Sequence, residues 1–241
     1  MRSGAKSPWR KDPDMSPSGK TRKIAVTTDG PYLVTGEVPL HRETAVPNEE
    51  GDPLEWRQGE ELQHGEDYAL CRCGQSRNKP YCDGTHSQGG FDGTETCDRG
   101  KYREKCRTVA GPELELTDAE EYCAEARFCH PEGGTWHLVR HSEDRDRMEL
   151  AIAQACNCPS GRLTVWKDGE PIEPELEPSI GVMEDPGAGV GGPLRVKGGI
   201  EIESADGTPY ETRNRVTLCR CGQSKNKPLC DGSHIRAGFK D

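Results

Sequence analysis

The stretch that decides the fold lies near the C-terminus, where residues 218–234 read LCRCGQSKNKPLCDGSH. It places three cysteines and one histidine among Gly, Pro, Asn and Asp, which is too polar and turn-rich for a strand or helix with a buried face. A metal centre rather than hydrophobic burial must therefore fix its shape. The stretch recurs upstream, where residues 71–86 read CRCGQSRNKPYCDGTH.

The composition points to small units with thin cores. The chain has 241 residues, of which 31% are hydrophobic and 5% aromatic, with 29 Gly and 18 Pro. Chains of this kind either stay disordered or need a metal or cross-link to hold their fold. Two near-identical Cys/His stretches favour the second alternative for most of the chain.

Charge and hydropathy exclude several classes of protein. The net charge of −10 is wrong for a nucleic-acid binder. No window approaches the 18 or so apolar residues of a membrane-spanning helix, and the first residues lack the apolar core of a signal peptide. We therefore expect a cytoplasmic protein without a membrane anchor. The thiols of its 12 cysteines stay reduced there and serve as metal ligands rather than disulfides.

The repeat extends beyond the cysteines. Residues 30–36 (GPYLVTG) resemble residues 192–198 (GPLRVKG). Two copies of strand, loop, strand and ligand loop predict an α+β, β-rich fold, with two homologous units about an internal pseudo-two-fold axis. The expected divisions are a flexible N-terminal arm (1–23), unit 1 (24–95), a central two-helix module (96–170), and a linker with unit 2 (171–241).

Local patterns predict the elements between these landmarks. Three short strands are expected at 24–26, 32–34 and 68–70, and a loop at 48–53. Thr117 and Glu120 have the spacing of a capping box, which predicts a helix to about Phe128. A second helix is expected from a cap at Ser142 to Cys156. A strand at 163–166 and a hairpin turn at 168–169 should follow, and the Pro-, Glu- and Gly-rich residues 171–192 indicate a linker over the surface.

The candidate ligands are the three cysteines and the histidine of each copy: Cys71, Cys73, Cys82, His86, Cys219, Cys221, Cys230 and His234. In each copy the third cysteine and the histidine are four residues apart, so one helical turn puts thiolate and imidazole on the same side. Asp83 and Asp231 stand where a helix N-cap accepts backbone N–H groups. This ligand set fits either a structural Cys3His zinc site or a [2Fe–2S] cluster.

Both copies resemble the CDGSH iron–sulfur family, the mitoNEET-like proteins, and the second carries the motif literally at residues 230–234. The resemblance implies two [2Fe–2S] clusters, one per unit. The first two cysteines of each unit would hold an inner iron, and the third cysteine and the histidine an outer, more exposed iron. In that family two units exchange strands to form a dimer. Here both units lie in one chain, which implies a monomer with an internal pseudo-dimer.

The central segment carries further cysteines. Cys123 and Cys129 are separated by five residues, and Cys156 and Cys158 precede Pro-Ser-Gly. This segment resembles a divergent single-cluster ferredoxin domain. A third cluster, buried free thiols in a packing module, and a redox disulfide remain open as alternatives. Cys97 and Cys106 receive no predicted role.

The sequence thus predicts an iron–sulfur protein for electron or cluster transfer, with proton-sensitive histidine ligands, and with a redox partner or an apo iron–sulfur acceptor. The alternative is a scaffold or binding module stabilised by zinc or an inert cluster. No phosphate-binding loop or catalytic triad is recognisable, so we expect no enzyme activity. Basic residues in the ligand loops would either dock an acidic partner or balance the charge of the cluster: Arg72, Arg77, Lys79, Arg220, Lys225 and Lys227.

Overall fold

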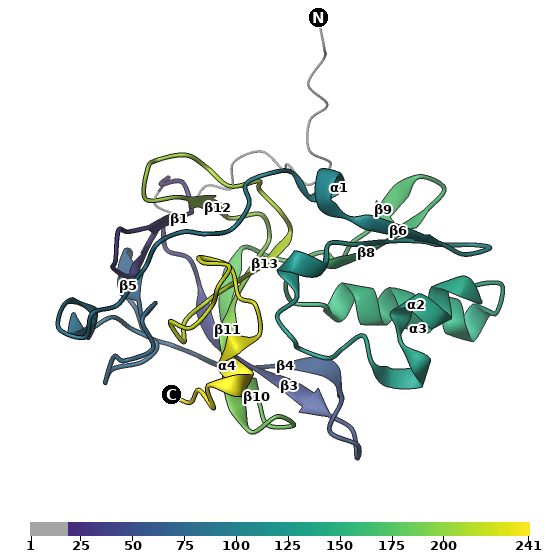
Figure 1. Cartoon of the computed structure of the whole chain (residues 1–241), viewed down its shortest axis with the longest axis horizontal. Coiled ribbons are helices and arrows are strands. Elements are labelled where there is room, and N and C mark those ends of the chain that lie inside the picture. Colours follow the sequence, from purple (N-terminus) through teal and green to yellow (C-terminus); the bar gives the residue numbers. More distant parts are fainter. Residues whose placement is uncertain (1–18) are drawn as a thin grey trace, which may run out of the picture.

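The computed structural model describes residues 19–241, which form three β-sheets with few helices (Figure 1). The predicted N-terminal arm lies almost wholly outside the described residues. The first sheet contains β12 (Glu201–Glu203), β1 (Lys23–Val26), β2 (Tyr32–Thr35) and β5 (Tyr68–Leu70), in that order. The second contains β13 (Arg215–Leu218), β11 (Val190–Lys197), β10 (Ser179–Asp185), β3 (Leu40–Pro47) and β4 (Pro53–Glu61).

The first two sheets each combine strands from both ends of the chain. β1 pairs in parallel with β12, with Ile24 opposite Ile202. β10 likewise pairs in parallel with β3, with Val182 opposite Arg42. Parallel pairs need a long crossover, which the chain between the two copies supplies. The N-terminal and C-terminal copies are therefore interwoven and share their sheets.

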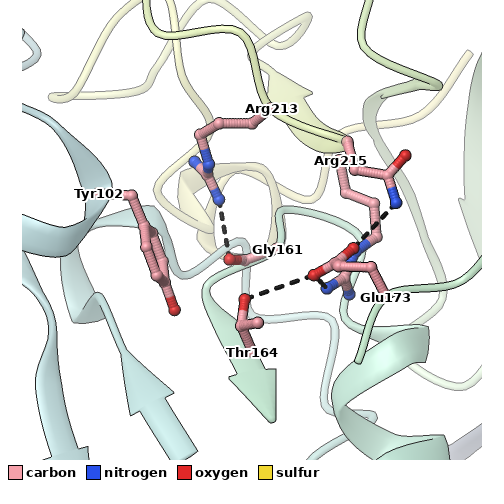
Figure 2. Close-up of a pocket in the computed structure, with 7 residues that line it drawn as sticks. Tyr102, Gly161, Thr164, Glu173, Arg213 and Arg215 are labelled. Atoms are coloured by element: carbon pink, nitrogen blue, oxygen red, sulfur yellow. Dashed lines mark hydrogen bonds and ion pairs between the residues drawn. The ribbon is translucent and has the colours of Figure 1, made fainter. Parts of the chain in front are cut away.

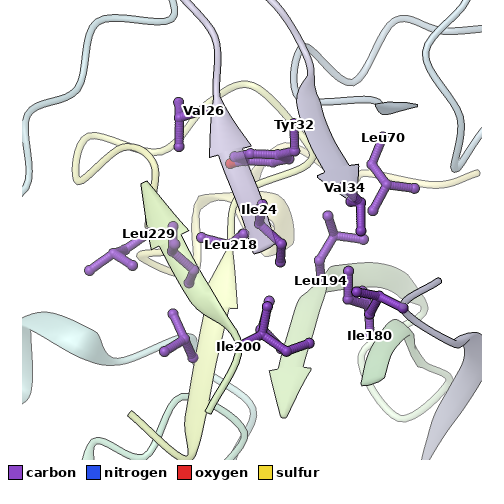
Figure 3. Packing of buried hydrophobic residues seen from close by; sticks show 14 of the residues in the cluster. Ile24, Val26, Tyr32, Val34, Leu70, Ile180, Leu194, Ile200, Leu218 and Leu229 are labelled. Atoms are coloured by element: carbon purple, nitrogen blue, oxygen red, sulfur yellow. The ribbon is translucent and has the colours of Figure 1, made fainter. Parts of the chain in front are cut away.

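A single apolar core lies between these interwoven strands (Figure 3). Ile24 and Val34 from the N-terminal copy and Ile180 and Leu194 from the C-terminal copy are fully or almost fully buried in it. Burial alternates along β1, so this strand has one face in the core, whereas every residue of β11 is buried. Burial of this core, rather than local propensity, holds the two copies together.

The central segment forms the third sheet, which packs against two helices. Its strands are β6 (Arg107–Ala110), β7 (Glu115–Asp118), β8 (Leu163–Lys167) and β9 (Glu170–Ile172). Leu116 and Leu163 from this sheet pack with Leu138 of α2 (Thr135–Arg140) and Ala151 of α3 (Arg145–Asn157) in a second apolar core. Two one-turn helices complete the fold: α1 (Tyr102–Lys105) and α4 (Ser233–Arg236).

The prediction of the strands at 24–26, 32–34 and 68–70, and of a turn after β3, is confirmed. The helix predicted from Thr117 is wrong, because Thr117 lies in β7 opposite Thr164. The Thr117 hydroxyl accepts from Trp166 Nε1 (2.8 Å) and donates to the Thr164 carbonyl (3.2 Å), so it is not available as a cap. The Glu120 carboxylate instead pairs with Arg107 at 2.7 Å.

The second predicted helix is α3, but its cap is Asp144, whose Oδ1 accepts from the backbone N–H groups of Asp146 (3.0 Å) and Arg147 (3.1 Å). Ser142 instead accepts from the backbone of Glu113 and Leu114, at 3.0 and 3.2 Å. α2 was not predicted.

The surface linker predicted at 171–192 is also wrong, because this segment supplies β9, β10 and the start of β11. Its glycines permit close packing rather than flexibility. A Cβ at Gly192 would lie 2.8 Å from Met183 Cβ, and one at Gly181 would collide with Glu43. Glu43 is itself buried, where it pairs with Arg195 (3.2 Å) and Lys197. Glycines that allow close packing within a sheet are easily mistaken in the sequence for those of a flexible loop.

Candidate metal centres

The first two cysteines of each copy form a close pair at the end of a strand. β13 ends at Leu218 and β5 at Leu70, immediately before the first ligand of each copy. The Sγ atoms of Cys71 and Cys73 are 3.7 Å apart, and so are those of Cys219 and Cys221. Two sulfurs bound to one tetrahedral metal at about 2.3 Å are separated by about 3.8 Å, so each pair has the spacing of two ligands on one metal.

The third cysteine and the histidine form a second pair in each copy. Cys82 Sγ lies 3.4 Å from His86 Nδ1, and Cys230 Sγ lies 3.4 Å from His234 Nδ1. Each histidine lies within the helical turn that begins after the left-handed Gly84 or Gly232, which brings the imidazole back over the thiol as the four-residue spacing predicts. This spacing also fits two ligands of one metal.

Neither pair acquires a third ligand. Within residues 19–241, no three His, Cys, Asp or Glu side chains converge closely enough to hold a single metal ion. Each copy therefore presents two separate two-ligand pairs.

Local hydrogen bonds fix the ligand loops. Asp83 accepts from the backbone N–H groups of Arg77 (2.9 Å) and Thr85 (3.0 Å), which holds the pKa of its carboxyl well below the usual range. Asp231 makes the same two bonds, to Lys225 (2.9 Å) and Ser233 (3.0 Å). The prediction that these aspartates are N-caps is therefore wrong: the N-caps are Gly84 and Gly232, and each aspartate instead ties the start of the helical turn to the loop before it.

Backbone N–H groups also point at the ligand sulfurs. Gln75 N lies 3.4 Å from Cys73 Sγ, Gly84 N lies 3.4 Å from Cys82 Sγ, and Gly232 N lies 3.5 Å from Cys230 Sγ. Such bonds stabilise thiolates and tune iron–sulfur centres.

Electrostatics in unit 2 prepare one thiol for metal binding. A hydrogen bond from the Cys221 thiol lowers the pKa of Cys219 to about 6, and the same bond raises the pKa of Cys221. The two buried thiols thus interact strongly with one another. Burial lowers the pKa of His234 to about 4, which keeps its imidazole neutral, the form that binds metals.

The two ligand loops touch one another. A Cβ placed at Gly74 would lie 2.5 Å from the carbonyl oxygen of Cys221, and a Cβ at Gly222 would lie 2.5 Å from that of Cys73. Both glycines have a left-handed φ, 76° and 77°. The unit 1 side chain Tyr32 also donates its hydroxyl to Cys219 O (2.8 Å) and Pro228 O (3.0 Å). The sequence did not predict this bond across the two units, because Leu194 replaces Tyr32 in the second copy.

The predicted basic docking patch is wrong for two of its three arginines, whereas Arg77 is exposed. Arg72 and Arg220 are only 1% and 2% exposed. Arg72 donates to the carbonyls of Thr27 (3.0 Å) and Gly93, and Arg220 donates to that of Gly192 (2.7 Å). Arg220 is also ion-paired with Asp241 and with Glu184 (3.4 Å), so these two arginines hold the protein's own structure together rather than offering a docking surface.

Three of the four central cysteines share one environment. Burial raises the pKa of Cys129 to about 12, and the neighbouring thiols of Cys158 and Cys123 add to the rise. Cys156 faces away from this group, with its Sγ 3.9 Å from the carbonyl oxygen of Ile172. We call Cys123, Cys129 and Cys158 the central cysteine group. All the described cysteines are free thiols in the structure, so the redox disulfide receives no support.

Two arginines missed by sequence reasoning join the central segment to unit 2 (Figure 2). Arg213 lies over the rings of Tyr102 and Tyr122 (5.2 and 4.3 Å to their centroids), and its Nη2 donates to the Gly161 carbonyl at 2.8 Å. Arg215 is 1% exposed and faces Glu173, with 2.9 Å between its Nε and Glu173 Oε2.

Arg215 also binds the main chain around the central cysteine group. Its Nη1 donates to the carbonyls of Ala155 (2.6 Å), Cys158 (2.8 Å) and Cys156 (3.1 Å). Because Arg215 begins β13, the strand that leads to Cys219, one side chain connects the two sites. The only signal in the sequence is a pair of charged residues before an apolar strand.

No helix among residues 19–241 has the length and apolar content needed to span a bilayer. Comparison with known families gave two matches. The family described as iron-binding zinc finger, CDGSH type, matches residues 29–87 and 191–235, and the family described as divergent 4Fe–4S mono-cluster matches residues 109–168. No curated protein and no solved structure matches the chain. The chain therefore carries two CDGSH-type iron-binding units, with a segment of the divergent 4Fe–4S mono-cluster type between them.

Proposed function

We propose that each unit binds one [2Fe–2S] cluster through three cysteines and one histidine, and that the protein carries electrons or delivers clusters. The observation that supports this most directly is the division of each ligand set into a Cys–Cys pair and a Cys–His pair. A cluster of two bridged irons takes two protein ligands on each iron. Cys71 and Cys73, or Cys219 and Cys221, would hold the inner iron.

A bound cluster supplies a site that takes up and releases one electron at a time. The protein sets the properties of that site. A neutral imidazole in place of a fourth thiolate removes negative charge, which favours the reduced form. Protons compete with the metal for the imidazole nitrogen, so ligation by His86 or His234 should weaken in acid.

We infer that the two units are related by a pseudo-two-fold axis. Three features are reciprocal: the parallel pairs β1–β12 and β10–β3, the contacts of Gly74 and Gly222 with the opposite loop, and the two matched ligand pairs. Reciprocal contacts of this kind are the mark of a two-fold interface. One chain would thus supply both halves of a strand-exchanged dimer.

Iron and acid-labile sulfide counts test the proposal. We expect protein purified without oxygen to be red-brown, with at least four irons and four sulfides per chain, and to lose two of each in the Cys82→Ala variant. The exposed Ser87→Ala variant should keep the full count. A colourless protein with zinc in place of iron would contradict the proposal and favour a zinc-stabilised scaffold.

Electron carrier and cluster donor differ in what leaves the protein. Reversible reduction by dithionite with retention of iron favours a carrier for a one-electron redox partner. Loss of iron and sulfide together to a four-cysteine apo-ferredoxin favours a donor. Neither role requires a catalytic group from the chain.

The central cysteine group supports a second candidate function, a third centre of the ferredoxin type. Its three cysteines gather in the segment that matches the 4Fe–4S family. In a four-iron cluster each cysteine binds a different iron, so the ligands need not converge on one point, and these three cysteines would hold three of the four irons. We expect Cys129→Ala to reduce the iron count, whereas Cys156→Ala, the matched control outside the group, should leave it unchanged. Equal counts in the two variants and the unmodified protein would contradict a third centre.

A further inference from the structure

The two units differ at one pair of equivalent glycines. Gly84 and Gly232 precede the ligand histidine of each unit by two residues, and both adopt a left-handed φ, 84° and 79°. A Cβ at Gly84 would meet no described atom within 4 Å. A Cβ at Gly232 would lie 2.5 Å from Cγ and Cδ of Glu125. The two glycines thus share one backbone conformation, but the space around Gly84 is open, whereas another segment covers Gly232.

Residues 121–127, which we call the cover segment, make this difference. The Glu121 carbonyl accepts from Asn226 Nδ2 at 2.8 Å, and Glu125 Oε1 lies 3.6 Å from Arg236 Nη1. Both partners belong to the unit 2 ligand loop and its terminal helix. The cover segment therefore lies against the loop and helical turn that carry the outer ligand pair of unit 2, at Gly232 between the two ligands.

A buried ion pair anchors the other end of the cover segment. Arg127 donates to both carboxylate oxygens of Asp185, at 2.8 and 3.0 Å, and to the Gly51 carbonyl at 3.1 Å. The Asp185 side chain is only 5% exposed. A two-bond guanidinium–carboxylate pair at such a site resists separation. The cover is thus part of the packed structure rather than a loose loop.

The ligands of the covered unit are less exposed than those of the open unit. Cys230 and His234 are 2% and 4% exposed, whereas Cys82 and His86 are only half-buried. The Cys82 and Cys230 pairs have the same S–N distance, so the contrast arises from the surroundings and not from the ligand geometry.

We propose that unit 1 is the exchange unit, which gives its cluster to an apo iron–sulfur acceptor that carries cysteine thiols, while the cover segment makes unit 2 retain its own. This inference rests on the proposed function. Transfer is a ligand exchange without oxidation or reduction. Four acceptor thiols lose their protons and bind the irons, Cys71, Cys73 and Cys82 take up three of these protons, His86 is released neutral, and the fourth proton passes to solvent.

The physical reason is access. An incoming thiolate must reach the outer metal before it can displace a ligand. At Cys82 and His86 it arrives from solvent. At Cys230 and His234 it arrives only after the cover segment has moved, which requires the Arg127–Asp185 pair to separate.

The test follows release from the intact, cluster-loaded chain. Excess bathophenanthroline is added in one arm and four-cysteine apo-ferredoxin in the other, with visible absorbance and protein-bound iron recorded over time. We expect a unit 1 phase at least tenfold faster than the unit 2 phase in both arms. His86→Cys should change only the fast phase and His234→Cys only the slow one, which assigns each phase to a unit.

Opening the cover supplies a second measurement. Arg127→Ala should accelerate the slow phase at least threefold and leave the fast phase unchanged. The matched control, Arg145→Ala, removes an arginine that is 84% exposed on α3 and should change neither phase.

Release of both units at one rate, or a fast phase that responds to His234→Cys, would overturn the exchange assignment, even if four irons are present. A chain without iron would instead refute the proposed function itself.

Discussion

The connection made by Arg215 gives the sharpest test of how the central segment is held to unit 2. Arg215→Met keeps a long apolar side chain but removes the guanidinium. The change leaves the Glu173 carboxylate, which is 13% exposed, without its ion-pair partner. It also leaves the carbonyls of Ala155, Cys156 and Cys158 without this donor.

The expected cost follows from these contacts. Removal of one partner from a buried ion pair costs about 3–5 kcal/mol, and each buried carbonyl that loses its donor adds about 1 kcal/mol or more, less than additively. Asn214 Nδ2 still donates to Glu173 at 2.9 Å and offsets part of the loss. A total of about 5 kcal/mol is comparable with the whole stability of many domains, about 5–15 kcal/mol.

Amide hydrogen exchange measures the loss of stability residue by residue. A local measurement is needed because a chain with several cores need not unfold in one step. We expect amides of residues 155–163 to lose most of their protection in Arg215→Met. Arg215→Met/Glu173→Gln should recover part of it, because the second change removes the unpaired charge. Arg103→Met, at a side chain that is 54% exposed, serves as the control. Protection in Arg215→Met within about 1 kcal/mol of the unmodified protein would refute the reasoning, because burial would then hold the segment without the arginine.

Three further predictions concern the ligand loops. Tyr32→Phe should destabilise by about 1–3 kcal/mol and raise amide exchange near Cys219 rather than in its own unit, because two buried carbonyls lose a donor; an effect confined to unit 1 would contradict this. Gly84→Ala should lower the free energy of unfolding by about 1–2 kcal/mol, because alanine disfavours the left-handed backbone. Gly232→Ala should lower it by about 1–3 kcal/mol more, because the new Cβ would overlap Glu125. Equal losses for the two variants in urea unfolding would contradict a cover over Gly232. In the metal-free chain, burial lowers the pKa of His234 to about 4. The neutral imidazole therefore contributes to stability above about pH 6.5, and this contribution is lost as the pH falls toward 4. The urea midpoints at pH 7 and pH 5 should differ less in His234→Gln than in the unmodified protein.

The sequence was most informative where spacing alone sets the chemistry. The third cysteine and the histidine of each copy meet as their four-residue spacing predicts, because a single helical turn is a local feature. The strands flanking Pro31 were also predictable, because short apolar runs beside a turn have few alternatives.

Sequence reasoning failed where long-range contacts decide the structure. Thr117 has the local pattern of a helix cap, but a tryptophan and a partner strand bind its hydroxyl first. The segment at 171–192 has the composition of a linker, yet Ile180 and Val182 are fully buried, and β10 lies between its neighbour β11 and β3 from the far end of the chain. Nothing within a few residues of Arg215 indicates that its partners lie in the central segment.

The exchange of strands between the two sheets has a consequence for dividing the molecule. The first sheet ends on β12, from the C-terminal copy, and β10 of the second sheet pairs with β3, from the N-terminal copy. A polypeptide cut between its copies would give two fragments, each with an exposed strand edge that only the other fragment completes. Each fragment would need the other to complete its sheets. Recovery of the visible colour when the two fragments are mixed would therefore report that they have reassembled.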